Sequence, residues 1–133
     1  MSYFIELKLS ENTNSVHTYS VKKLRCVYER PYNSMSPSAS PRCTGIEVTV
    51  ASPEKTDLFL NDWYISNRKV SGTLDVVSVV ALNKKDLIRN IATFKSAVCY
   101  YYGEIYSSDE DRYIILHFDA DRVATNNIEF KHL

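Results

Sequence analysis

Apolar and polar residues alternate with a period of two along most of the chain. In residues 3–9, YFIELKL, the odd positions hold Tyr, Ile and Leu while the even positions hold Phe, Glu and Lys. Successive side chains of a β-strand point to opposite faces, so this alternation predicts a half-buried strand. Residues 44–52, TGIEVTVAS, alternate most clearly of all and are predicted as a second such strand.

Further alternating segments are predicted as extended structure: 17–30, 68–80, 87–107 and 113–130. The alternation in the first of these changes phase near Lys22 and Lys23, which predicts a β-bulge. The segment 87–107 is long enough for two strands or for one bent strand. We expect a loop at 82–86, LNKKD, and a turn at 107–112, SSDEDR.

The period changes in residues 52–66, SPEKTDLFLNDWYIS. Ser52 can cap a helix, and Pro53 suits the first helical position because the N–H that proline lacks would be unpaired there. Phe59 and Trp63 are four residues apart and therefore share one face of a helix. The segment predicts the only helix of the chain, about three turns long.

The order of these elements favours one fold class. Strands come first, then one helix, then strands again, which is typical of a mainly β barrel or sandwich of antiparallel strands with a single flanking α-helix. The chain of 133 residues can bury one core but is short for two, so residues 1–133 are predicted to form a single domain.

The composition of the chain argues against several classes of function. The chain holds 16 basic and 16 acidic residues, so it lacks the positive charge that nucleic-acid binding uses. Its longest apolar-rich run, LDVVSVVAL, is too short and too polar to span a membrane, and its first residues do not read as a secretory signal. We expect a soluble protein made in the cytoplasm, without a signal peptide, that neither binds nucleic acid nor inserts into membranes.

No arrangement of residues predicts catalysis, a cofactor or a metal. The cysteines, Cys26, Cys43 and Cys99, form no CxxC pair and are predicted to be reduced and buried. The segment HFDAD would place His117, Asp119 and Asp121 on one side of a strand, but ligands two residues apart on a straight strand do not converge on one ion. The run YYY at 100–102 is explained by packing on the two faces of a strand. We therefore expect no enzyme activity.

The stretch RPYNSMSPSASPRCTG, residues 30–45, separates two predicted strands and holds three of the four prolines. Prolines restrict the backbone, and the polar side chains between them cannot form a core. Such a segment suits an arm that reaches a neighbouring subunit. The alternative is a disordered surface loop.

Beyond these patterns, the order SYFIELKL, a polar RP loop, TGIEVTV and TDLFLNDWYIS resembles the Hcp tube proteins of type VI secretion systems, and within them the TssD branch of Bacteroidetes. The similarity covers nearly the whole chain and includes Ser52, Asp57, Leu58, Phe59, Trp63, Lys85, Ile91, Phe94, Ala97, Cys99, Tyr102 and Glu104. It departs from the usual pattern at Cys43 and Thr44, where a second glycine is common.

The resemblance implies a β-barrel with one flanking helix whose copies form rings of six. Stacked rings would make an inner tube that a contractile sheath propels, with a spike at its tip, and that carries effector proteins out of the cell. The protein would then be cytoplasmic during assembly and extracellular after injection. The stacking contact would lie in the proline-rich loop, for which the expected interface residues are Pro31, Tyr32, Met35, Pro37, Pro41 and Arg42.

Two other functions fit the residues. A monomeric β-barrel could bind a small apolar ligand in a cavity lined by tyrosines. A phage tail-tube protein would have a closely related architecture. The oligomeric state of the purified protein separates the first of these from a tube subunit.

Overall fold

The computed structural model describes residues 3–12, 15–29, 42–51, 57–82, 84–108, 112–125 and 128–131. This part of the chain is mainly β with one short helix, as the sequence predicts. Its elements in chain order are β1 (Tyr3–Asn12), β2 (Ser15–Glu29), β3 (Arg42–Ala51), α1 (Phe59–Ser66), β4 (Val70–Ala81), β5 (Lys84–Tyr106), β6 (Arg112–Asp119), β7 (Arg122–Thr125) and β8 (Ile128–Lys131).

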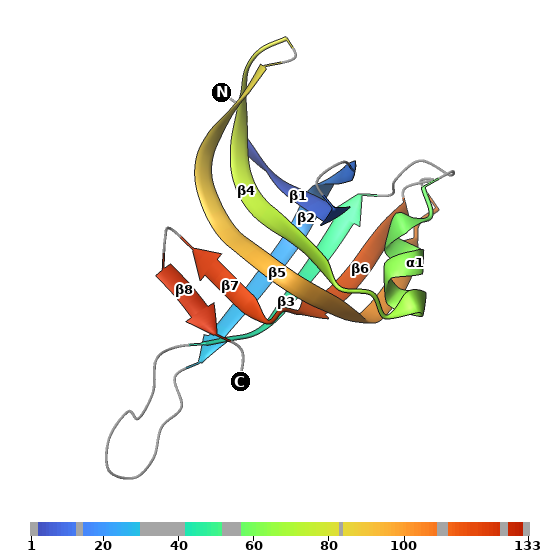
Figure 1. Ribbon diagram of the computed structural model, residues 1–133. Coiled ribbons are helices and arrows are strands. Elements are labelled where there is room, and N and C mark those ends of the chain that lie inside the picture. Colours follow the sequence, from blue (N-terminus) through green and yellow to red (C-terminus); the bar gives the residue numbers. More distant parts are fainter. Residues whose placement is uncertain are drawn as a thin grey trace.

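The strands form a barrel with α1 beside it (Figure 1). Their order in the sheet is β4-β1-β2-β3-β6-β5-β7-β8, and β4 also pairs with β5. That additional pairing closes β4, β1, β2, β3, β6 and β5 into a ring, in which every neighbouring pair is antiparallel. The barrel with one flanking helix is therefore confirmed. Closure leaves these six strands without a free edge over most of their length.

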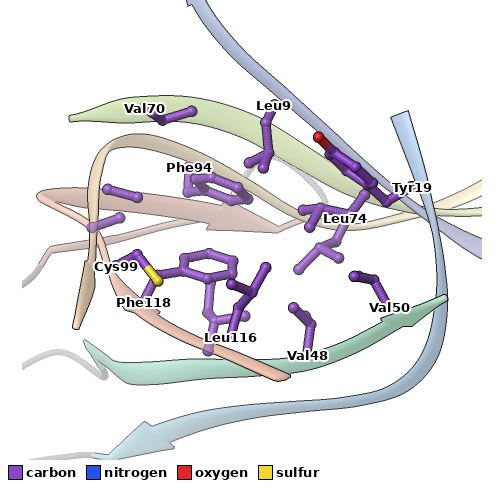
Figure 2. Packing of buried hydrophobic residues seen from close by; sticks show 14 of the residues in the cluster. Leu9, Tyr19, Val48, Val50, Val70, Leu74, Phe94, Cys99, Leu116 and Phe118 are labelled. Atoms are coloured by element: carbon purple, nitrogen blue, oxygen red, sulfur yellow. The ribbon is translucent and has the colours of Figure 1, made fainter. Parts of the chain in front are cut away.

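The barrel interior is filled by the apolar side chains that alternate along the strands (Figure 2). Phe94 and Phe118 lie at its centre with ring centroids 4.9 Å apart, and Trp63 of α1 packs on Phe118 at 5.2 Å. The indole N–H of Trp63 donates hydrogen bonds to the carbonyl oxygens of Arg68 and Ala97, each at 3.1 Å. The helix is thus held to the barrel by both packing and hydrogen bonds.

The helix is shorter than the sequence predicts. It begins at Phe59, and the two described residues before it, Asp57 and Leu58, are not helical. Ser52 and Pro53, where the helix was predicted to start, lie outside the described ranges. Asp57 explains the boundary, because its carboxylate accepts a hydrogen bond from the backbone N–H of Phe59 at 2.9 Å. The helix ends at Ser66, and the following C-cap residue, Asn67, adopts a left-handed conformation with φ of 59°.

The segment 87–107 is one bent strand rather than two. β5 runs for 23 residues, and Ser96 within it has a φ of 57° where the pairing with β4 slips. β6 pairs with β5 beyond this bend, and β7 pairs with β5 before it. The expected single stretch at 113–130 is therefore divided into three strands, because the chain must cross the bend after β6.

Two other expectations concern the strands. The bulge predicted near Lys22 and Lys23 is confirmed, since the β2–β3 register slips between Val21 and Lys23. The loop prediction at 82–86 is wrong for residues 84–86, because β5 already begins at Lys84. Backbone pairing with β4 outweighs the polar composition of that segment. Within the described ranges, no helix is long and apolar enough to cross a membrane.

Candidate assembly surfaces

The hairpin of β4 and β5 extends beyond the barrel as an arm (Figure 1). β1 pairs with β4 only as far as Ser78, whereas β4 continues to pair with β5 up to Ala81 and Lys84. We define the arm as residues 79–82 and 84–88. Among the described residues, each strand of the arm pairs only with the other strand of the hairpin.

The arm exposes large apolar side chains, whose burial against another surface would be energetically favourable. Leu82 is 92% exposed, and the other large apolar side chains of the arm are also exposed: Val79, Val80, Leu87 and Ile88. Register slips in the β4–β5 pairing leave Val80 and Ile88 without a directly opposite residue. Such bulges redirect the side chains of the bulged strand. Several large apolar side chains exposed on one short segment mark a candidate interaction surface.

An ion pair fixes the root of the arm. Glu6 on β1 is only 5% exposed, and its carboxylate accepts a hydrogen bond from Lys85 Nζ at 3.1 Å. The same ammonium group lies 5.3 Å from the centre of the Phe4 ring. Lys85 therefore reaches back from the arm over the barrel, and its charge compensates that of a buried carboxylate. This contact sets the position of the arm relative to β1.

The outer side of α1 carries a second apolar surface. Leu60 and Trp63 face the barrel, while Leu58 and Ile65 are exposed by 71% and 69%. We call Leu58, Asn61, Asp62 and Ile65 the helix stripe, because their spacing of i, i+3, i+4 and i+7 places them on one side of the helix. Its apolar ends flank Asp62, which pairs with Arg68. An ordinary surface helix presents polar residues at these positions.

The outward face of β2, β3 and β6 is hollowed by two adjoining depressions of about 430 and 400 Å³. Both are lined by Lys23, Thr49 and Ile115. One is completed by Leu24, Arg25, Glu47, Val48 and His117, the other by Lys22, Ile105 and Tyr113. Cationic and apolar groups thus share this face. Its charges are partly compensated, since Arg25 lies 3.7 Å from Glu47.

A polar cluster joins the end of β5 to β6 and α1. The hydroxyl groups of Tyr102 and Tyr106 each donate to the Glu104 carboxylate at 2.9 Å, and Arg112 forms an ion pair with it. Hydrogen bonds from Tyr106, Tyr102 and Arg112 hold the pKa of Glu104 below its ordinary value. Tyr64 of α1 stacks on Tyr102, with centroids 6.0 Å apart. The cluster ties together elements that flank the barrel.

The interface residues expected from the sequence fall mostly outside the described part of the chain. Pro31, Tyr32, Met35, Pro37 and Pro41 lie outside it, and Arg42 is described only as the first residue of β3. Sequence reasoning missed the arm and the helix stripe. The signals were present in the runs LFL and VVALNKKDLI, where apolar residues occur without alternation, but packing explained them equally well.

The residues considered for chemistry serve packing. Cys43 and Cys99 are buried, as predicted, whereas Cys26 is only half-buried. Burial raises the pKa of Cys26 and Cys99 to about 11, which keeps these thiols protonated and unreactive near neutral pH. His117 stacks on Tyr101 at 4.4 Å. No cluster of three metal-ligating side chains occurs within the described ranges.

Comparison with known proteins gives one family and one fold. Residues 1–132 match the family described as Hemolysin coregulated protein Hcp (TssD). Hcp1 from Flavobacterium johnsoniae superimposes with a TM-score of 0.72 at 14% identity, covering 97% of this chain and 99% of that chain. Hcp1 from the E. coli EAEC 042 pathovar, solved as a mutant, gives 0.73 at 8% identity and covers 98% of both chains.

A third similar structure belongs to the baseplate of the anti-feeding prophage, a sixfold-symmetrised assembly. It gives a TM-score of 0.60 at 9% identity, covering 96% of this chain and 95% of that chain. At these identities the structural matches establish the fold alone. No curated protein matches the sequence.

Proposed function

The chain belongs to the Hcp (TssD) family, and we propose that it is a structural subunit of the inner tube of a type VI secretion system. In this proposal six copies form a ring, rings stack into a tube, and residues 1–133 act as one tube-subunit domain. A contractile sheath surrounds the tube, and a spike lies at its end. The tube carries effectors during contractile injection. The protein is then released outside the cell in which it was assembled.

The observation that carries the proposal is the exposed apolar arm. Each large aliphatic side chain that becomes fully buried in a contact stabilises that contact by about 1.5–3 kcal/mol of free energy. The arm has five such side chains, so a contact that covers them offsets much of the entropy lost on association. The sixfold symmetry of the similar prophage baseplate supports a ring of six. The secreted protein Hcp3 from Pseudomonas aeruginosa, which has the same fold at a TM-score of 0.63, supports release.

The proline-rich loop remains our proposal for the contact between rings. Its predicted interface residues are Pro31, Tyr32, Met35, Pro37, Pro41 and Arg42. In the chain order the loop connects β2 to β3, two strands that carry the hollowed outer face, whereas the arm belongs to the hairpin of β4 and β5. Two separate segments suit a subunit that must make two kinds of contact, one within its ring and one with the next ring.

Light scattering of arm variants tests the role of the arm in assembly. We expect Leu82→Glu combined with Leu87→Glu to reduce the assembly to single chains, because two carboxylates would have to be buried in the contact. Both side chains are exposed, so circular dichroism and the thermal midpoint should stay close to wild type. The matched control, Leu82→Met with Leu87→Met, keeps the apolar surface and should assemble normally. Full-size assemblies of the glutamate variant would exclude the arm from the contact.

A further inference from the structure

The arm and the helix stripe lie at opposite ends of one strand. α1 ends at Ser66, β4 begins at Val70, and the arm is at the far end of β4 (Figure 1). A twelve-residue strand spans roughly 40 Å when straight. The arm of one chain therefore cannot cover the helix stripe of the same chain, and both surfaces stay exposed in a single copy.

A ring of more than two copies needs two different surfaces that fit each other. Each subunit presents one surface to the neighbour on one side and the other surface to the neighbour on the other side. Contact between two arms would be isologous and would stop at a dimer. The arm and the helix stripe are two different exposed apolar surfaces, and they lie at opposite ends of β4. They can therefore face two different neighbours.

The two surfaces are complementary in chemistry. On the helix stripe, the exposed apolar side chains of Leu58 and Ile65 lie about 10 Å apart along the helix axis, with Asp62 between them. On the arm, exposed Lys84 lies between Leu82 and Leu87 in the sequence. The last turn of α1 has no basic residue, and Arg68, which follows the helix, is shared between Asp62 and Glu11, so these three side chains together keep one net negative charge for an outside cation.

We infer that the arm of each subunit packs on the helix stripe of the next subunit in the ring. Leu82 and Leu87 contact Leu58 and Ile65, and Lys84 faces Asp62 and the carboxyl end of α1. This inference rests on the proposed ring, and it names the partner surface of the arm. The occupant of the helix stripe is thus a second copy of this chain.

Disulfide trapping between copies tests the contact. In a Cys26→Ser background, the variant carrying Leu82→Cys and Ile65→Cys should, after mild oxidation, give a ladder of linked chains up to six on a denaturing gel. Either cysteine alone should leave single chains. A second pair, Leu87→Cys with Leu58→Cys, repeats the test in case the first pair disturbs folding. The control pair, Leu82→Cys with Ile105→Cys on the hollowed face, should not link.

The outcomes separate this inference from the proposed function. Rings of wild-type mass without a ladder from either test pair would overturn the arm-to-helix contact and leave the tube subunit standing. Linked dimers from Leu82→Cys alone would show an arm-to-arm contact and would also overturn it. A wild-type protein that forms no ring at all would instead contradict the proposed function.

Discussion

At the scale of single residues, Gly72 has the least room for a side chain of the three glycines. A Cβ atom there would lie 2.1 Å from the Lys8 carbonyl oxygen and 2.9 Å from the Phe94 ring. β1 and β4 can pair closely at this level only because residue 72 has no side chain. The sequence places a glycine within an alternating strand, which signals a close approach, but the partner strand can be named only from the structure.

Replacing this glycine should weaken the fold. We expect Gly72→Ala to lower the free energy of unfolding by about 1–3 kcal/mol or more, because a backbone carbonyl and a central ring must both shift. Gly45→Ala is the matched control, since its added Cβ would lie 3.4 Å from the Tyr100 hydroxyl, close to an ordinary contact. Urea unfolding of both variants checks this. Equal midpoints would mean that the strands separate at Gly72 without cost.

At the scale of elements, sequence reasoning was most reliable where one face of a strand is buried. β1 and β3 alternate cleanly because the barrel interior selects their apolar faces, and the period alone predicted them. It failed where a tertiary contact sets a boundary. The helix start coincides with the hydrogen bond from the Phe59 N–H to the Asp57 carboxylate, and the division after β6 depends on a bend in β5 that local alternation does not reveal.

The arm escaped prediction for the same reason. The composition of residues 82–86 is polar and reads as a loop, yet pairing with β4 makes most of it strand. Its exposed leucines and isoleucine were indistinguishable from core residues without a structure. The proline-rich loop, in contrast, was the visible candidate from the sequence, and its assembly role stays a prediction.

The contact between Glu6 and Lys85 joins two elements and can be tested as a pair. We expect Lys85→Met to lower the free energy of unfolding by about 1–2 kcal/mol, because it leaves a buried carboxylate without its cation while keeping an apolar chain over Phe4. The double variant Glu6→Gln, Lys85→Met should recover most of that loss. Lys84→Met, the neighbouring control, should change it by no more than about 0.5 kcal/mol. Chemical denaturation checks all three, and equal losses at Lys84 and Lys85 would show that the ion pair does not hold the arm.

At the scale of the whole molecule, the groups of the barrel that can bind a partner lie on its outer surface. The interior is packed with side chains, and the thiols of Cys26 and Cys99 are protonated near neutral pH. The arm and the helix stripe are the surfaces that expose apolar side chains to a partner. A filled barrel offers little room for the small apolar ligand considered from the sequence. These features fit a subunit whose function is assembly with copies of itself.

Native mass spectrometry of the purified wild-type protein, with negative-stain imaging of the same sample, shows whether it assembles into rings. We predict a species of six times the chain mass of 15.3 kDa, seen as sixfold rings, that stacks as concentration rises. A single chain at every concentration, with no ring in the images, would contradict it.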